Sequence, residues 1–497
     1  METTNFSQPT RQSSKGILII FAFKTFQFFR KFGVFFLAFG FSIMKKKYLG
    51  FLTPTNLILI LLFVLFVILI IAILNYQNFK FHVSLDDFHL TRGIINKDNT
   101  IIPKSKIQNV YLKQNWLQQL INVVSVNIET AGDQKSEIEI SALDRSTALQ
   151  LKSELYSVSS QLHDENHEVI ENNVFFKASP KRLLLEGISK NHLRSFAIIA
   201  SFVFGLYYEF KDYINNLSFI DRLEDSIQIN EGSIVNVLIA NAILVFIIVL
   251  ISMLFSIVKT FIVNFNLQVI ENKKTIEINK GLFNKVSLSL TPSRIQNIVV
   301  TTNRIKHYFG LHTLSVKQAM VNAKQRKNFE IIALEKHQLD HLLGKLLVNY
   351  DSEIEASKPK PYYKRILAYK MIFLISIINI PGFLIFGNRM WYINIALIVL
   401  AVLYIIKTYS KSYYKIDDEF ITIGSGFIDT TTNILEIHKI QAVKLKQSMF
   451  QKRIEISSVY IYTASKVLKI PYVLEQEARS IYDYLLFKVE SQDKDWM

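Results

Sequence analysis

Cysteine is absent from this chain of 497 residues. Its absence excludes disulfide bonds, thiolate metal sites, iron–sulfur clusters and cysteine nucleophiles. The sequence also lacks a serine nucleophile elbow, a phosphate-binding glycine loop and paired carboxylates in a pocket-like pattern. No residue pattern therefore argues for an enzyme, and we expect neither a catalytic site nor a cofactor.

Apolar and basic residues dominate the composition. Half of the chain is apolar and its mean hydropathy is +0.23, which is typical of a membrane protein. Lysine and arginine number 57 against 41 aspartate and glutamate residues, giving a net charge of +16. The densest basic clusters border apolar segments, where they commonly anchor a protein to the inner leaflet, so we expect membrane lipids rather than nucleic acid as partners.

Six apolar segments are candidates for membrane-spanning helices. Residues 57–74 and 234–258 are long and uninterrupted, and about 20 apolar residues suffice to cross ~30 Å of hydrocarbon. Shorter candidates are residues 196–208, 371–386 and 391–406. The first candidate, residues 16–44, is interrupted by three basic residues, so it either spans from about residue 32 or lies in the membrane interface.

The charge of the connecting segments indicates their side of the membrane. Residues 177–194 contain five basic residues and one acidic residue, whereas residues 209–231 contain six acidic and two basic residues. The positive-inside rule therefore places the soluble parts in the cytoplasm. Three consecutive lysines at residues 45–47 conflict with this assignment, because they would lie in the outer turn of the first hairpin. Whether residues 16–44 cross the membrane stays open.

An internal repeat occurs three times without a gap. A glycine is followed 15 residues later by the glutamine of a basic-Ile-Gln triplet, and 23 residues after that by an alanine. The glycines are Gly93, Gly281 and Gly426, the triplets are Lys106-Ile107-Gln108, Arg294-Ile295-Gln296 and Lys439-Ile440-Gln441, and the alanines are Ala131, Ala319 and Ala464. Three matches at both spacings indicate three copies of one structural module.

Each copy has the periodicity of strands followed by a helix. Residues 84–92, 107–112 and 124–130 alternate apolar with polar side chains, which predicts half-buried antiparallel sheet. The glycine comes at a strand end, where a turn or bulge needs a permissive backbone. Helical periodicity closes each copy, for example over residues 339–347. We therefore predict an α+β membrane protein in which a C-terminal helix caps each small antiparallel sheet.

These repeated residues resemble the bacterial pleckstrin-homology-like (PH-like) domains, in particular those of the YdbS/YdbT-like membrane proteins. The first copy shows the glycine-ended strand, Lys106-Ile107-Gln108-Asn109-Val110 and Thr130-Ala131-Gly132. The other two copies have Met320 or Ser465 in place of the last glycine. The resemblance implies a multi-pass protein of a bacterial cell membrane in which hairpins alternate with PH-like modules, and it implies no reaction.

The predicted domain organisation follows from the spans and the repeats. Three transmembrane hairpins are each followed by one PH-like sheet or barrel. The boundaries are hairpins at 16–75, 195–258 and 366–408, modules at 79–157, 264–349 and 411–490, a linker with a basic approach at 158–194 and a second linker at 350–365.

Two sets of residues are candidates for binding. In the triplets, isoleucine would face the core, while the basic residue and glutamine would point the other way and form an interaction face. These residues are Lys106, Gln108, Arg294, Gln296, Lys439 and Gln441. Alternatively, the glutamines satisfy backbone groups in a neighbouring turn.

The second set lies in the basic segments that approach the hairpins. Interleaved basic and apolar residues are typical of an interfacial segment that contacts anionic lipid. The candidates are Lys177, Lys181, Arg182, Lys190, Arg194, Lys364 and Arg365. A solvated linker is the alternative.

Histidine spacing suggests little metal chemistry. His163 and His167, and also His337 and His341, are four residues apart, but neither pair has the glutamate of a zinc-protease motif. We expect no metal site.

The favoured function is a non-enzymatic membrane scaffold or sensor whose cytoplasmic modules bind lipid headgroups or a companion PH-like membrane protein. The alternative is a small transporter or channel with regulatory modules.

Overall fold

The computed structural model describes residues 6–44, 54–130, 137–156, 173–214, 234–272, 275–290, 292–318, 329–350 and 354–491. It contains two compact units. Unit 1 comprises Met1–Val174 and Ile270–Leu290, and unit 2 comprises Phe175–Val269 and Thr291–Met497. The boundary therefore runs through the second repeat copy, whose first strands belong to unit 1 and whose remaining strands belong to unit 2.

The six apolar segments are helical, as expected. The helices are α1 (Gly16–Met44), α2 (Pro54–Asn78), α6 (Leu193–Ile214), α8 (Ile234–Val263), α11 (Tyr362–Phe386) and α12 (Met390–Ser410). Within the described residues, four stretches are long and apolar enough to cross a membrane, and they lie in α2, α8, α11 and α12. The described apolar part of α6 is shorter, Arg194–Val203. The expectation of an α+β protein with apolar membrane helices is thereby confirmed.

Unit 1 contains the first module together with α1 and α2. One sheet has the order β1 (Thr10–Arg11), β2 (Lys80–Val83), β3 (Asp87–Arg92) and β4 (Asp98–Pro103). The next strands are β5 (Ile107–Gln114), β6 (Val124–Thr130) and β7 (Glu137–Leu143), and α4 (Arg145–Tyr156) follows them. In β3 the apolar Phe88 and Leu90 alternate with polar residues and are almost completely buried, as the period of a strand requires. They join Ala148 and Leu151 of α4 in one core.

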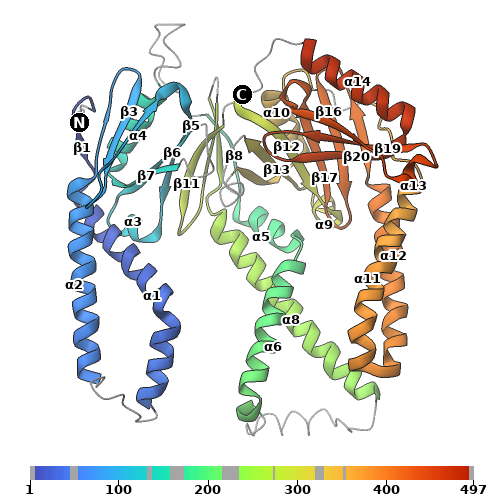
Figure 1. Ribbon diagram of the computed structural model, residues 1–497, viewed down its shortest axis with the longest axis horizontal. Coiled ribbons are helices and arrows are strands. Elements are labelled where there is room, and N and C mark those ends of the chain that lie inside the picture. Colours follow the sequence, from blue (N-terminus) through green and yellow to red (C-terminus); the bar gives the residue numbers. More distant parts are fainter. Residues whose placement is uncertain are drawn as a thin grey trace. The chain divides into compact units, whose positions relative to one another are not determined.

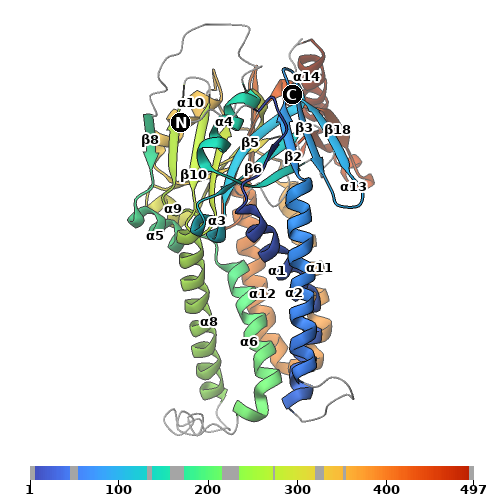
Figure 2. The same cartoon turned by 90° about the vertical axis from the view of Figure 1, so that its left-hand side faces the viewer.

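The first module also recruits residues that precede the first apolar helix. Strand β1 pairs with β2, and Phe6 is buried with Phe81 in the module core. The Ser13 backbone N–H donates to the Ala142 carbonyl oxygen at 2.9 Å. The predicted module boundary of 79–157 did not include these residues. In Figures 1 and 2, α1 and α2 leave the strands of unit 1 on the same side.

Unit 2 contains the rest of the second module, the third module and four apolar helices. Its larger sheet has the order β14 (Glu330–Leu334), β13 (His312–Gln318), β12 (Ile295–Thr302), β17 (Thr430–Glu436), β16 (Phe420–Gly426) and β15 (Tyr413–Ile416). Its smaller sheet has the order β18 (Ala442–Lys446), β19 (Ile456–Tyr462) and β20 (Val467–Leu474). Helix α10 (Lys336–Leu346) follows β14, and α14 (Glu475–Ser491) follows β20. Ala478 and Leu485 of α14 are buried in the core of the third module.

Strands of neighbouring copies share sheets, which the sequence analysis did not anticipate. In unit 1, β10 (Ile276–Lys280) and β11 (Lys285–Leu290) of the second copy extend the sheet of the first copy, because β11 pairs with β5. In unit 2, β17 of the third copy pairs with β12 of the second copy. Strands β8 (Asn173–Lys177) and β9 (Gln268–Glu271) lie at the boundary between the units. The repeat copies are therefore linked by backbone pairing as well as by the chain.

The three repeat glycines have the same backbone conformation. The φ angles of Gly93, Gly281 and Gly426 are 114°, 111° and 139°. A Cβ atom on any of them would lie within about 2.0 Å of the carbonyl oxygen three residues later. Only glycine fits such a turn, because it lacks a side chain and tolerates positive φ. The same turn therefore recurs at the same position in all three copies.

Candidate functional site

A short capped helix recurs in each of the three modules. These helices are α3 (Trp116–Leu120), α9 (Arg304–Tyr308) and α13 (Met449–Lys452). Their N-cap residues are Asn115, Asn303 and Ser448, each seven residues after the triplet glutamine. Each N-cap side chain accepts a hydrogen bond from a backbone N–H of the first turn. This extension of the repeat was not predicted from the sequence, although the pattern Asn/Ser-x-x-Gln/Lys could have revealed it.

The third residue of each short helix is buried. The exposed fractions of Gln118, Lys306 and Gln451 are 2%, 5% and 9%. In the first module, Gln118 Nε2 donates to Ser125 Oγ at 2.6 Å and to the Ser141 carbonyl oxygen at 2.7 Å. A neutral amide at this position is therefore satisfied from inside the module.

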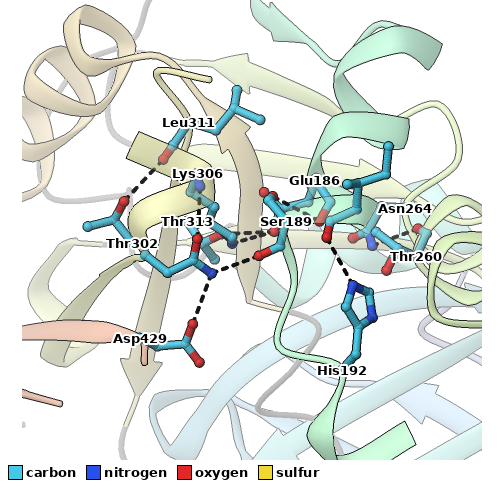
Figure 3. Close-up of polar contacts among 12 residues, drawn as sticks. Glu186, Ser189, His192, Thr260, Asn264, Thr302, Lys306, Leu311, Thr313 and Asp429 are labelled. Carbon is cyan, nitrogen blue, oxygen red and sulfur yellow. Dashed lines mark hydrogen bonds and ion pairs between the residues drawn. The ribbon is translucent and has the colours of Figure 1, made fainter. Parts of the chain in front are cut away.

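The second module has a lysine at this buried position. Lys306 Nζ donates to Thr313 Oγ1 at 2.7 Å and to Glu186 Oε1 at 2.5 Å. The side chains of Lys306 and Glu186 are only 6% and 3% exposed. A buried charge is tolerated when an opposite charge and hydrogen bonds compensate for its lost hydration. Figure 3 shows Glu186, Lys306 and Thr313 pointing toward one another.

Glu186 comes from α5 (Pro180–Ser189), the helix that precedes the second pair of apolar helices. Ser179 caps α5, and proline occupies its first turn, where no backbone donor is needed. A Cβ atom at Gly187 would lie 3.0 Å from the Ile257 Cα atom, so α5 packs closely on α8. Helix α5 therefore connects the membrane helix α8 with α9 of the second module.

The same site extends to the third module. Asn303 Nδ2 donates to the Ser189 carbonyl oxygen at 2.7 Å and to Asp429 Oδ1 at 3.0 Å. Asn191 Nδ2 also donates to Asp429, at 3.3 Å. Asp429 belongs to the turn that begins at Gly426. The polar junction formed by Glu186, Ser189, Asn303, Lys306 and Asp429 (Figure 3) thus joins α5 to two modules.

A related contact joins the first and second modules in unit 1. Gln119 Nε2 of α3 donates to the carbonyl oxygens of Leu282 and Phe283, both at 3.0 Å. These carbonyls belong to the turn that begins at Gly281. In both units, then, the short helix of one module contacts the glycine turn of the next.

Unit 1 also contains a cavity of about 950 Å³ beside α3 and α1. Aromatic and apolar side chains, including Phe23, Phe26 and Trp116, line it together with Lys24 and Gln12. Asn75, which also lines the cavity, lies in the last turn of the apolar stretch Ile58–Asn78. Gln12 is only 4% exposed, and its Oε1 atom has no hydrogen-bond partner. The cavity combines apolar walls with polar groups, as a site for an amphipathic molecule requires.

The triplet residues do not share one environment. Ile107, Ile295 and Ile440 are 3%, 4% and 3% exposed, so the isoleucines belong to the core. Of the remaining residues, Lys106 and Gln441 are exposed, Arg294 is half-buried, Lys439 and Gln296 are buried, and the side chain of Gln108 lies outside the described part. The structure therefore does not gather these side chains on one exposed face, and their role in binding stays a prediction.

The basic segments are largely accessible. The exposed candidates are Lys177, Lys181, Lys190, Arg194, Lys364 and Arg365. Arg182 differs, because its guanidinium pairs with Glu335, donates to Gln338 Oε1 at 3.3 Å and lies 5.8 Å from the ring centroid of Phe176. Arg182 is thus engaged within unit 2, while lipid contact by the other six residues stays a prediction.

The histidine pairs do not form a recognisable metal centre in the described residues. His163 and His167 lie outside the described residues. His337 Nδ1 lies 3.5 Å from Glu335 Oε2, and the ring of His341 stacks on Phe175 at 4.5 Å between centroids. The described parts of the chain contain no group of three or more His, Cys, Asp or Glu side chains that could hold a metal ion.

Apolar helices, three repeated modules and shared antiparallel sheets define a membrane protein with tandem PH-like domains. Residues 32–159, 220–348 and 373–488 each match the model of the bacterial PH domain family, so the chain belongs to this family. The chain is also 25% identical over 396 residues to the UPF0699 transmembrane protein YdbT of Bacillus subtilis (strain 168), covering 76% of this chain and 78% of that protein. The interpretation as a YdbS/YdbT-like protein with three PH-like repeats is confirmed.

Proposed function

We propose that this protein is a non-enzymatic scaffold or sensor of a bacterial cell membrane, whose PH-like modules lie in the cytoplasm and bind membrane lipid. Three helical hairpins, formed by α1 and α2, α6 and α8, and α11 and α12, carry the modules. The cavity in unit 1 is the observation that supports lipid binding most directly. It lies beside the end of the apolar stretch of α2 and combines aromatic walls with Lys24 and the unpartnered Gln12 Oε1 atom.

A phospholipid fits this combination of groups. Its acyl chains would contact the exposed Phe23 and Phe26 of α1, which are 60% and 64% exposed. Its headgroup would accept a hydrogen bond from Lys24 and offer polar contacts to Gln12. A site with an apolar part and a polar part can take up a phospholipid where the hydrocarbon of the bilayer meets water.

Replacement of Ile20 by tryptophan tests this site, because Ile20 lines the cavity and a larger ring would occupy it. Leu18→Trp is the matched control, since Leu18 is 49% exposed on the same helix. Native mass spectrometry of protein released from nanodiscs should show phospholipid bound to the wild type and to Leu18→Trp, but not to Ile20→Trp. Equal lipid retention by all three proteins would contradict lipid binding in the cavity.

The proposed side of the membrane is tested independently with single cysteines in this cysteine-free chain. Leu85, His337 and Val467 are exposed positions in the three modules. Each cysteine variant should resist a membrane-impermeant thiol reagent in intact cells and react after permeabilisation. Labelling of any of the three in intact cells would contradict a shared cytoplasmic side.

A small transporter or channel is the second candidate. Its support is the pair Asn379 and Asn394, which exchange hydrogen bonds of 2.9 and 2.7 Å between α11 and α12. The four long apolar stretches contain no acidic residue and no histidine, however, whereas the proton relays of pumps and transporters usually consist of Asp, Glu or His. The reciprocal pair is explained by packing of two helices in a hairpin.

A further inference from the structure

The two sheet joints between neighbouring modules use the same register. In unit 1, Lys285 pairs with Gln114 and Val286 with Lys113. In unit 2, Thr430 pairs with Thr302, and Thr431 with Thr301. In both joints the residue four positions after the repeat glycine lies opposite the residue six positions after the triplet glutamine. One interface, repeated in detail, therefore joins module one to two and module two to three.

The first and third modules each contain a strand that is equivalent to a strand of these joints. Strand β4 of the first module corresponds to β11 and β17, and β18 of the third module corresponds to β5 and β12. Within the described residues, β4 pairs only with β3, and β18 pairs only with β19. Alternate residues of β18 are exposed, whereas the first five residues of the internal strand β12 are buried. An edge strand offers unpaired backbone donors and acceptors to another strand.

The side chains of these two edges are complementary in the repeated register. Applying that register places Asp98 of β4 opposite Lys446 of β18 and Thr100 opposite Lys444. Opposite charges across an antiparallel pair are favourable, and like charges are unfavourable. Pairing of β18 with a second β18 is therefore disfavoured by its lysines. Beside these edges, Ile95 of the first glycine turn and Met449 of α13 are 94% and 86% exposed.

We propose that β18 of one chain pairs with β4 of a second copy of this chain, in the register that the chain already uses twice. The resulting contact is head to tail, and such a contact produces a closed ring or an extended row of molecules in the membrane plane. The inference rests on the proposed scaffold function, because it requires all modules to lie on one side of the membrane. It identifies a second copy of the chain as the partner of the scaffold and pairing of β18 with β4 as the contact through which the copies assemble.

Disulfide trapping tests the proposed register directly. Two differently tagged chains, one with Asp98→Cys and one with Lys446→Cys, are co-expressed and oxidised in native membranes. Directly opposed residues on paired strands meet the distance requirement of a disulfide, so a linked pair carrying both tags should form. The matched control replaces Asp98→Cys by Asn99→Cys, whose side chain points to the other face of the strand. The expected yield is about tenfold lower for this control, given the strict geometry of the bond.

Charge exchange provides the second measurement. Asp98→Lys or Lys446→Asp alone should reduce the number of subunits counted by single-molecule photobleaching, and the two together should restore it. Asp86→Lys and Lys336→Asp, at exposed positions outside the strands β4 and β18, should leave the count unchanged. Two results would overturn the proposal: equal trapping by Asp98→Cys and Asn99→Cys chains, or no disulfide between the two differently tagged chains. Thiol labelling and lipid retention test the proposed function, whereas trapping and photobleaching test the pairing of β18 with β4. The two proposals can therefore fail independently of each other.

Discussion

The junctions of the first and second modules solve the same packing problem in different ways. Both place the third residue of a capped helix in a buried site, but Gln118 is satisfied inside its module, whereas Lys306 depends on Glu186 of α5. The first junction can therefore form without a charge from outside. The second cannot, since an unpaired buried ammonium is strongly destabilising.

The two junctions therefore differ in what they connect. The second junction ties α5, and through it α8, to two modules with hydrogen bonds and an ion pair. Beside the first junction lies the cavity instead. A buried ion pair is specific for one partner and one geometry, whereas a cavity leaves space for a ligand.

Removal of the Glu186 carboxylate should have the largest effect on stability. Glu186→Ala leaves Lys306 buried without its counter-charge, which should destabilise the protein by about 3–5 kcal/mol. Thermal unfolding in detergent, followed by circular dichroism, measures the loss. The double variant Glu186→Gln with Lys306→Gln should recover most of it, because it imitates the neutral Gln118 junction. Asp340→Ala, at an exposed site, is the control, and a loss as small as its own would show that the ion pair is dispensable.

Substitution of two of the repeat glycines should distinguish the cost of local backbone strain from the loss of contacts in the polar junction. Gly93→Ala and Gly426→Ala both force a Cβ atom onto a carbonyl oxygen at positive φ, which should cost about 1–3 kcal/mol at either site. Only the turn at Gly426 carries Asp429, which binds Asn303 and Asn191. Hydrogen exchange should therefore increase in α5 for Gly426→Ala but not for Gly93→Ala. Identical exchange in α5 for both variants would mean that the turn does not hold the junction.

Truncation of Gln118 should have a smaller effect than loss of Glu186. Gln118→Ala removes the donors to Ser125 and Ser141 and the acceptor for the Asn115 backbone N–H. Unsatisfied neutral groups of this kind cost about 1–3 kcal/mol, less than an uncompensated charge. The unfolding midpoint should fall accordingly, while Leu120→Ala, at a residue 77% exposed, should leave it nearly unchanged. A loss equal to that of Glu186→Ala would remove the distinction between neutral and charged junctions.

Substitution of Lys466 in the third module should have the smallest effect. Its half-buried ammonium donates a hydrogen bond to Asn433 Oδ1. Burial, with a smaller contribution from Lys317, lowers the pKa of Lys466 from 10.5 to about 8. Between these pH values the unfolded chain binds more protons than the folded one, so stability should rise with pH across this window. Lys466→Met should remove the rise and stabilise the protein at pH 7 by about 1 kcal/mol, a value reduced for solvent screening. A rise of the same size in Lys466→Met would assign it to another group.

Several features could be predicted from local sequence patterns. Long apolar segments predicted the membrane helices, because the hydrocarbon layer selects length and composition. Constant spacing predicted the three modules, the resemblance of the repeated residues indicated their PH-like family, and alternation predicted the strands around Phe88 and Leu90. The glycine turns were also predictable, because one residue type alone fits their backbone. All of these depend on residues close together in the sequence.

Tertiary structure decided which separated residues meet. The pairing of β5 with β11 and of β12 with β17 joins strands of different copies, and each copy by itself is equally compatible with a self-contained sheet. Glu186 and Lys306 are 120 residues apart, so no local pattern indicated that one neutralises the other. Nor could the sequence place Phe6 in the core of a module that begins beyond two apolar helices. Periodicity determines which face of an element is buried, but the element that covers this face is determined by the packing of the whole chain.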